Sequence, residues 1–214
     1  MSAKEQTIQN QIEFRPSEPS EAKIASRLLF ESNPRMATFM IGLGSEPRAK
    51  SILAKIFSTP GHRLSYQFTE MVVQKSQVIG LCTFFPGRHL SKLNRQLSVI
   101  LLRHYPLRGK VAMILRGFPL IFIKEAAQDE LFVSNLVLKK RARNQGVGTQ
   151  ILNYIEAKAR EMGLEKVSLM INIDSREARQ FLERHGFKVE ALHLESNKRV
   201  SHLGTGYLRM VKKV

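Results

Sequence analysis

The hexapeptide from Arg143 to Gly148 (RNQGVG) combines a cation and two glycines in the way that anion-binding loops do. Glycine lets the backbone approach a ligand closely, and the apolar residues that recur afterwards predict a helix beginning at Val147. The first turn of a helix presents unpaired N–H groups and the positive end of the helix dipole, which together bind phosphate. The loop therefore predicts a pyrophosphate site. Further cations directly precede it, namely Lys139, Lys140 and Arg141.

Two common phosphate-binding motifs do not fit this loop. The Rossmann pattern G-x-G-x-x-G requires glycine or alanine at position 151, which is Ile151 here. The P-loop requires Gly-Lys followed by Ser or Thr, and no such sequence follows the glycines.

The elements around the loop are the clearest in the chain. Residues 131–138 (LFVSNLVL) predict a buried strand before it, and residues 147–162 predict an amphipathic helix that Gly163 ends. Residues 166–173 predict another strand. Asp174 is then expected to cap a third helix, with Glu177 as the reciprocal partner and with Ala178, Phe181 and Leu182 buried. That helix stops at Gly186, and residues 187–194 and 206–214 predict the last two strands.

The N-terminal half predicts two helices and a hairpin. A short strand over residues 12–15 ends at Pro16, a helix capped by Ser20 follows, and a second helix spans residues 46–57. Residues 66–74 and 78–85 are rich in β-branched and aromatic residues, and the turn at 75–77 joins them into a hairpin.

The segment from Met71 to Lys124 contains no Asp or Glu. Its apolar residues predict two short amphipathic helices split near Pro106–Gly109, and residues 88–128 are expected to form a helical insertion packed on the main fold. A helix lying on a membrane surface is the alternative. Such a cationic field attracts nucleic acid, anionic lipid or a phosphorylated cofactor. Its cations are Lys75, Arg88, Lys92, Arg95, Arg103, Arg108, Lys110, Arg116 and Lys124.

Length and composition restrict the class of protein. The chain has 214 residues, a net charge of +16 and one cysteine, Cys82, so disulfide scaffolds and cysteine-cluster zinc sites are excluded. We expect a single domain over residues 1–214. No signal-peptide pattern and no run of 18 apolar residues occurs, which predicts a cytoplasmic protein. The six histidines lack metal-ligand spacing, so no metal is predicted.

The pattern R-x-x-G-x-G, placed between a strand and a helix, resembles the GNAT superfamily of N-acetyltransferases from about residue 12 to the C-terminus. The segment from Ala178 to Phe187, with Phe181-Leu182-Glu183-Arg184-His185-Gly186-Phe187 at its end, is similar to a second signature of that family. The resemblance implies an α/β (α+β) fold with a mixed, mostly antiparallel sheet of about seven strands flanked by helices. It also implies that the strands over residues 131–138 and 166–173 splay apart.

The resemblance further implies a cosubstrate and a reaction. The pantetheine arm of acetyl-CoA would enter the gap between the splayed strands, and a substrate amine would attack the thioester directly. A strand N–H would stabilise the developing oxyanion. The implied cosubstrate-binding residues are Leu136, Val137, Leu138, Arg143, Asn144, Gln145, Gly146, Val147, Gly148, Thr149 and Ser175.

The sequence departs from the family where proton transfer is concerned. Many members carry a tyrosine acid in the helix before Gly186-Phe187, and Leu182 occupies that position here. Ser175 replaces a frequent asparagine, and the strand that often offers a carboxylate shows Met170 and Asn172. Tyr207 is the candidate substitute acid. The candidate bases are Glu70, Glu125, Asp129, Glu130 and His193, with Glu130 taken forward, and Ser134 and Asn135 are expected to line the cleft.

The leading hypothesis is an acetyl-CoA-dependent N-acetyltransferase acting on a primary amine of a small molecule or peptide. The basic segment favours an acceptor that carries an anionic group beside its amine. One alternative is an acyl-CoA-binding module with little turnover or with another acyl group. Another is a basic protein that associates with nucleic acid or a membrane surface, although few aromatic residues accompany the cations as stacking platforms. A monomer and a homodimer are both left open.

Overall fold

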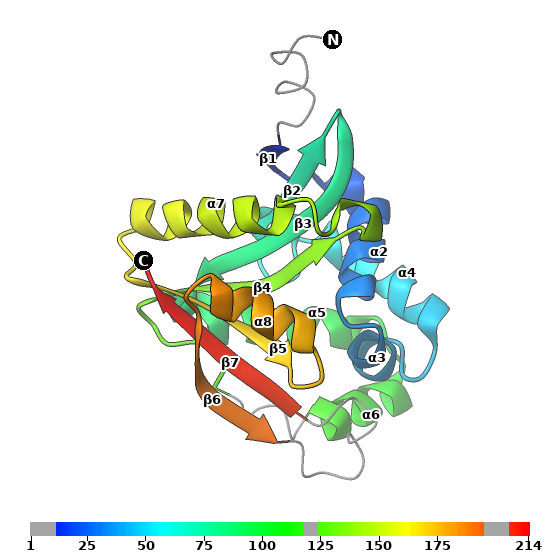
Figure 1. Ribbon diagram of the computed structural model, residues 1–214. Coiled ribbons are helices and arrows are strands. Elements are labelled where there is room, and N and C mark those ends of the chain that lie inside the picture. The colour runs from blue at the N-terminus through cyan, green and yellow to red at the C-terminus, as the bar shows by residue number, and fades with distance from the viewer. Residues whose placement is uncertain (1–11, 118–123, 195–205) are drawn as a thin grey trace.

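A computed structural model of the chain describes residues 12–117, 124–194 and 206–214 (Figure 1). Its principal elements follow in chain order: β1 (Ile12–Pro16), α2 (Ala22–Ser32), α3 (Pro34–Met36), α4 (Glu46–Phe57), β2 (Thr69–Gln74), β3 (Gln77–Pro86), α5 (Leu90–Arg103), α6 (Leu107–Gly117), β4 (Glu130–Leu138), α7 (Val147–Glu161), β5 (Lys166–Asn172), α8 (Arg176–Arg184), β6 (Lys188–Leu194) and β7 (Gly206–Lys213).

The strands form one mixed sheet of seven, in the order β1-β2-β3-β4-β5-β7-β6. Only β4 and β5 pair in parallel, and the other neighbouring strands are antiparallel. Helix α7 connects these two parallel strands, as a parallel pair requires. The predicted fold class is therefore confirmed.

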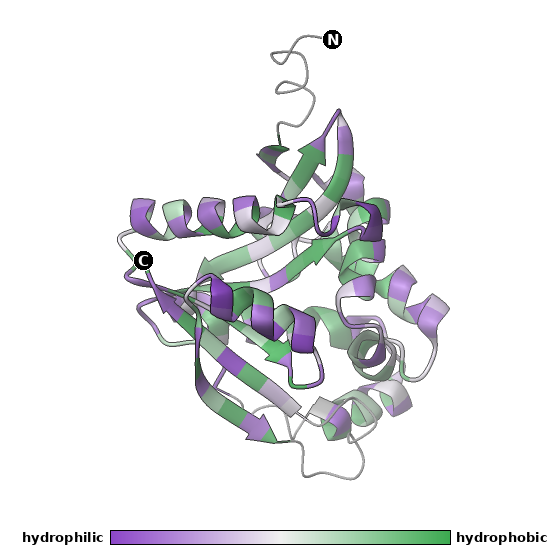
Figure 2. Cartoon of the chain, viewed as in Figure 1, coloured by the Kyte–Doolittle hydropathy of each residue, from purple (hydrophilic) through white to green (hydrophobic). Residues whose placement is uncertain are grey.

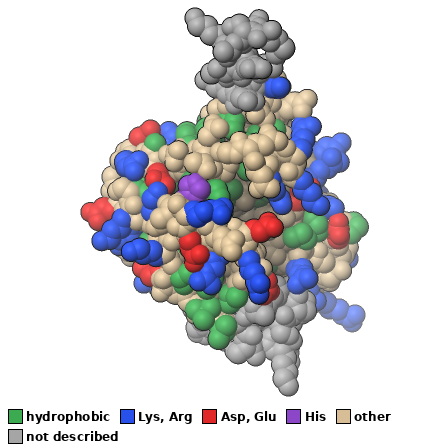
Figure 3. Space-filling view, in the orientation of Figure 1, with side chains coloured by type: hydrophobic (Ala, Val, Ile, Leu, Met, Phe, Trp, Pro, Cys, Tyr) green, Lys and Arg blue, Asp and Glu red, His purple; other side chains and the backbone are tan. Residues whose placement is uncertain are grey.

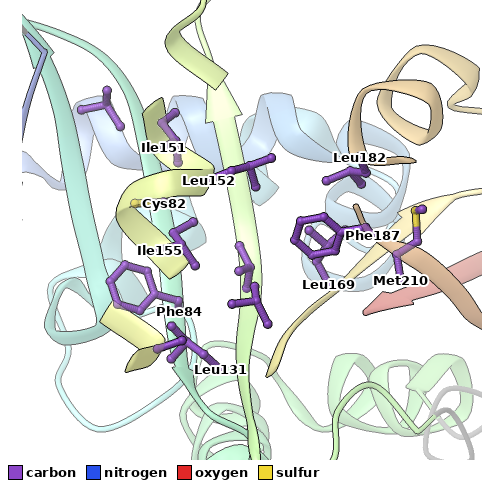
Figure 4. Close-up of a cluster of buried hydrophobic side chains, with 14 of the residues drawn as sticks. Cys82, Phe84, Leu131, Ile151, Leu152, Ile155, Leu169, Leu182, Phe187 and Met210 are labelled. Carbon is purple, nitrogen blue, oxygen red and sulfur yellow. The ribbon is translucent and has the colours of Figure 1, made fainter. Parts of the chain in front are cut away.

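Helices cover both faces of the sheet. On one face, Ile151, Leu152 and Ile155 of α7 and Leu182 of α8 point into a core with residues of β3, β4, β5 and β7 (Figure 4). Helices α2 and α4 cover the opposite face with a second core cluster. The outer sides of the helices are largely hydrophilic while the central strands are hydrophobic (Figure 2), as burial of one helix face demands.

Strands β4 and β5 pair only over their first halves. Their register runs from Glu130 opposite Lys166 to Val133 opposite Leu169 and stops there. Beyond that point β4 remains paired with β3 up to Leu138, and β5 remains paired with β7 up to Asn172. Ser134 is an extra residue in β4, because Thr83 lies opposite Asn135 while Phe84 lies opposite Val133. This β-bulge bends β4 where the two strands separate, which confirms the expected splayed pair.

The acid-free segment contains the two predicted helices, α5 and α6, and the chain turns between them at residues 104–106. Leu93 of α5 packs with Phe85 and Phe132 of the sheet. The Tyr105 hydroxyl donates a hydrogen bond to the carbonyl of Ile41, within the core built on α2 and α4. The predicted insertion is thus packed on the main fold, and residues 118–123 of it lie outside the described residues.

Several predicted boundaries are wrong, and local hydrogen bonds explain them. Residues 66–68 form a 3₁₀ turn rather than strand, since the Thr69 hydroxyl donates to the carbonyl of Ser65 and turns the chain. Ser20 does not cap a helix, because residues 19–21 form a 3₁₀ turn in which the Glu21 carboxylate accepts the Glu18 N–H. Helix α2 starts after that turn, at Ala22.

The predicted cap of α8 is also wrong. Ser175 is the N-cap, and the backbone N–H of Asp174 instead donates to the Asn172 side chain in a turn that ends β5. Ala178 and Phe181 are half-buried, and Leu182 alone of the three predicted core residues is buried. The short helix α3 and the π-helical turn at Ala37–Ile41 were not predicted. The polar residues at the start of this segment interrupt any extended apolar periodicity.

Candidate functional site

The glycine loop forms an uncovered helix N-terminus. Gly146 is the N-cap of α7 and has a φ of +75°, a left-handed conformation that glycine adopts without strain. Asn144 is also left-handed, with a φ of +59°, and asparagine tolerates this region better than most residues. Gly146 has no side chain that could cap the helix, and a Cβ placed on it would meet only open space. The first-turn N–H groups therefore face room for a ligand.

The cations around the loop divide into two groups. Lys139 and Arg141 bind the end of the β2–β3 hairpin, since Lys139 Nζ donates to the carbonyl of Val78 (2.5 Å) and Arg141 Nη2 to Gln77 Oε1 (2.6 Å). Burial, together with the nearby Arg141 charge, lowers the pKa of Lys139. Lys140 and Arg143 are exposed, and Arg143 Nε donates to the carbonyl of Leu138 (3.1 Å). Lys139 and Arg141 thus hold the loop against the hairpin, and the exposed cations give the loop positive charge.

The first turn of α7 lies directly against α8. A Cβ on Gly148 would come within 3.0 Å of the Phe181 ring, so glycine permits this close approach. The Thr149 hydroxyl bonds His185 Nε2 (2.9 Å), and His185 Nδ1 donates to the carbonyl of Phe181 (2.8 Å). The two sequence signatures are therefore in contact. The Thr149 side chain bonds the end of α8, while its backbone N–H belongs to the first turn of α7.

The opening between β4 and β5 joins the remaining predicted cosubstrate residues. Leu136, Val137 and Leu138 all lie on the part of β4 that has lost its β5 neighbour. Helix α7 follows this arm of β4, and α8, with Ser175 as its N-cap, follows the corresponding arm of β5. Two helix N-termini thus follow the separated strand ends; the first turn of α7 has no acidic residue, whereas that of α8 carries Glu177.

A polar network that was not predicted from the sequence lies next to the bulge at Ser134. The Arg63 guanidinium forms a bidentate ion pair with Glu125 (2.6 and 3.1 Å) and donates to Asn94 of α5 (2.9 Å). It also donates to Ser134 Oγ at the bulge (3.0 Å). Asn135 donates to the same oxygen (3.2 Å) and accepts a hydrogen bond from Ser32 of α2. Arg63 stands alone in its sequence context, so no spacing pattern pointed to it.

The two catalytic candidates lie at opposite ends of the strand pair. Tyr207 of β7 pairs with Asn172, at the open end of β5. Glu130 instead begins β4 at the paired end, four positions before the bulge, and its side chain is 1% exposed. Arg209 Nη2 donates to its carboxylate (2.6 Å), as does the backbone of Ala127 (2.8 Å). This buried ion pair thus holds Glu130 at the paired end of the two strands, away from the bulge.

The other acid–base candidates are similarly dispersed. Asp129 is bound by Lys166 near the paired end, and that hydrogen bond lowers its pKa. Glu70 accepts a hydrogen bond from the Tyr154 hydroxyl on α7, and burial, together with this bond, raises the pKa of Tyr154. His193 pairs with Tyr207 from β6. Only Glu125 is linked to the bulge, through Arg63.

Within the described ranges, no helix is long and apolar enough to cross a membrane, and no three His, Cys, Asp or Glu side chains gather as metal ligands do.

Comparisons with known proteins agree with this geometry. A family model described as the Acetyltransferase (GNAT) family matches residues 65–187, more than half of the chain. The fold is similar to that of an N-acetyltransferase from Staphylococcus aureus Mu50, with a TM-score of 0.72 at 16% identity, covering 93% of this chain and 99% of that one. A second crystal structure, described as an acetyltransferase, gives a TM-score of 0.68 at 20% identity and covers 94% of this chain and 99% of that one.

One curated relative matches over a shorter stretch. The aminoalkylphosphonate N-acetyltransferase of Salmonella typhimurium (strain LT2) is 38% identical over 56 residues. The match covers 26% of this chain and 36% of that protein, so the chain spans about a third of its length.

Proposed function

Because the chain belongs to the GNAT acetyltransferase family, we propose that it transfers an acetyl group from acetyl-CoA to a primary amine of a small molecule or peptide. The separation of β4 from β5 after Val133 and Leu169 carries this proposal. The separated arm of β4 offers unpaired backbone edge to an extended ligand, and it leads into the uncovered N-terminus of α7. Acetyl-CoA, which carries its thioester on an extended pantetheine arm that ends in a pyrophosphate, suits a strand edge that leads into a helix N-terminus.

The residues of the loop fit the pyrophosphate of CoA. The first-turn N–H groups from Gly146 to Thr149 offer donors, the open space at Gly146 admits the phosphates, and the exposed Lys140 and Arg143 supply charge. The backbone of Leu136, Val137 and Leu138 would bind the pantetheine amides. Ser175, exposed at the start of α8, remains a proposed contact.

Acetyl-CoA supplies the activated carbonyl when it is bound. The amine would form a C–N bond to the carbonyl carbon and the C–S bond would then break, so negative charge would develop first on the carbonyl oxygen and then on sulfur. The bulge at Ser134 interrupts the ladder with β3 and leaves Ser134 without a partner residue in that ladder. We assign the stabilisation of the carbonyl oxygen to an N–H of this segment.

Proton transfer requires groups other than Leu182, which is 4% exposed in the core and has no acidic proton. The thiolate of CoA needs little help, because a thiol has a pKa near 8.5. We propose Tyr207 as the proton donor, on its place at the open end of β5, and Glu125 as the group that receives the proton of the acceptor ammonium.

Tyr207→Phe removes the proposed acid and leaves the ring. We expect kcat to fall by about tenfold to a hundredfold with little change in acetyl-CoA affinity, since general acid catalysis contributes at least that much. Tyr66→Phe, in the 3₁₀ turn before β2, is the matched control and should keep its rate. Full activity in Tyr207→Phe would remove Tyr207 from the mechanism.

The acceptor is tested by following free CoA while amines are screened. The panel contains amino acids, polyamines, aminoglycosides, peptide N-termini and, because of the curated relative's name, aminoalkylphosphonates. The cationic segment supports an acceptor with a carboxylate or phosphonate beside its amine. Acetylation of polycationic amines alone would contradict the anionic acceptor.

A second candidate function rests on Leu182, whose burial leaves the family's acid position without chemistry. It is an acyl-CoA-binding module with little turnover or with another acyl group. Tight acetyl-CoA binding with no CoA release across the whole panel would favour this candidate over the enzyme.

A further inference from the structure

Helix α6 exposes a continuous apolar stripe. The side chains of Leu107, Val111, Ile114 and Leu115 are 76%, 50%, 59% and 61% exposed. Their spacing of three and four residues places them on one face of the helix. Exposed leucines scattered singly need no explanation, but a stripe along one helix face marks an interaction surface.

The opposite side of α6 is fixed to the fold, so the stripe cannot turn inward. Met113 is buried in the core with α2 and α4. Arg116 Nη1 donates to the carbonyl of Phe39 (2.5 Å), and a Cβ on Gly109 would touch the Tyr105 side chain. Figure 1 places α6 at the edge of the molecule, and Figure 2 shows its alternating green and purple sides.

Cations flank the apolar stripe on both sides. At 3.6 residues per turn, Arg108 falls beside Leu115 at one border, and Lys110 falls beside Ile114 and Leu107 at the other. Both cations are exposed. The helix lies within the stretch from Met71 to Lys124, which has no acidic residue. An apolar face bordered by cations suits the boundary between lipid headgroups and acyl chains, where cations reach back to the phosphates.

We propose that α6 docks the protein on an anionic lipid surface. The charge pattern favours lipid over the other occupants of an apolar face. A second copy meeting this face would bring the same cations together, and like charges repel. Nucleic acid would neutralise the cations but would leave the stripe exposed to water. Docking is independent of acetyl transfer, which takes place at the opening between β4 and β5.

The experiment is cosedimentation of the full chain with vesicles of phosphatidylcholine and phosphatidylglycerol, with pure phosphatidylcholine vesicles alongside. We expect the protein to bind the anionic vesicles and to bind the neutral vesicles only weakly. Binding to the anionic vesicles should weaken as salt is added. The double variant Leu107→Gln/Leu115→Gln should lose at least about tenfold in affinity, because apolar insertion is removed. The double variant Arg108→Gln/Lys110→Gln should lose roughly thirtyfold.

Matched controls make the same chemical changes elsewhere. Leu192 and Leu194 of β6 are 54% and 69% exposed, so Leu192→Gln/Leu194→Gln changes equally exposed leucines. Lys23→Gln/Arg27→Gln removes two exposed cations from α2. Both control variants should keep the wild-type affinity, and circular dichroism melts confirm that every variant is folded.

The proposal is overturned if the anionic vesicles leave the protein in solution, or if the control variants lose as much binding as the α6 variants. Sedimentation equilibrium tests the second copy, since a dimer that Leu107→Gln/Leu115→Gln dissociates would place a copy on the stripe instead. Duplex DNA binding that only the cation variant weakens, without vesicle binding, would assign the face to nucleic acid. Acetylation without vesicles should be equal in the wild type, in Leu107→Gln/Leu115→Gln and in both control variants.

Discussion

At the scale of single residues, Gly146 contributes a backbone conformation and an absence of side chain. Its φ of +75° and the open space beside it place the first amides of α7 where a ligand can reach them. The RNQGVG sequence made this position recognisable, because few residues other than glycine occupy it without strain.

Gly146→Asp and Gly146→Asn test the proposed pyrophosphate site as a pair. Both side chains tolerate the left-handed region and have nearly equal size, so they share any backbone strain. Only aspartate places a negative charge against the phosphates. We expect acetyl-CoA to bind Gly146→Asp at least about tenfold more weakly than Gly146→Asn, measured by calorimetry. Equal affinities would show that the phosphates bind elsewhere.

His62 is fully buried before β2 and carries a pH dependence that the proposed function does not use. Its Nδ1 accepts the N–H of Leu64 (3.2 Å), so the proton is on Nε2, which donates to the carbonyl of Ile56 (2.9 Å). Burial disfavours the charged imidazolium and lowers the pKa of His62 below 6.5. The unfolded chain therefore binds this proton more readily than the folded chain does.

Folding stability should accordingly be full above pH 6.5 and fall as the pH drops below it, by up to about 1.4 kcal/mol per pH unit from this group. Urea unfolding across the pH range measures the slope. His62→Gln should flatten it between about pH 6.5 and the lowered pKa, while His104→Gln, at an exposed position, should not. An unchanged slope in His62→Gln would assign the dependence to other groups.

At the scale of elements, the end of the β4–β5 pairing decides where a ligand can enter. The strands other than β2 were predictable within about one residue from their apolar runs, whereas β2 begins at Thr69 instead of residue 66. The splayed pair followed from the family resemblance. The network of Arg63, Glu125 and Asn94 was not predictable, because it joins a loop, α5 and the segment before β4, which lie far apart in the sequence. Its hydrogen bonds join these three pieces next to Ser134, and Glu125 among them is the proposed proton acceptor.

Arg63→Met should lower the free energy of unfolding by about 2 kcal/mol, because it leaves the partly buried Glu125 carboxylate without its bidentate partner. In the Arg63→Met background, Glu125→Gln should lower the free energy of unfolding much less than it does in the wild type. The double-mutant cycle measures this coupling. Arg179→Met is the control, since Arg179 pairs with Glu183 at a site where both side chains are more exposed. Its loss should stay below about 1 kcal/mol, and equal losses would contradict the network's role.

At the scale of the whole molecule, the net charge of +16 is unevenly distributed. The face drawn in Figure 3 intersperses both signs of charge, whereas the stretch containing α5 and α6 carries cations alone. Capture of a polyanion such as acetyl-CoA should therefore depend on ionic strength.

The KM for acetyl-CoA is expected to rise several-fold between about 0.05 and 0.5 M salt, as the Debye length shortens. The acetyl thioester of pantetheine has no phosphate and serves as the control, so its KM should change little. A parallel rise for both thioesters would indicate a general effect of salt on the protein instead.

The sequence by itself determined the glycine loop, the strands and helices beside it, and the family to which these belong. These features are local, since a left-handed glycine, a helix N-terminus and an apolar period each depend on neighbouring residues. Tertiary structure alone decided that Glu130 is buried against Arg209 while Tyr207 lies at the open end of β5. It also decided that Leu107, Val111, Ile114 and Leu115 face outward. An apolar helix face reads the same in sequence whether it is buried or exposed, because burial depends on which distant elements pack against it.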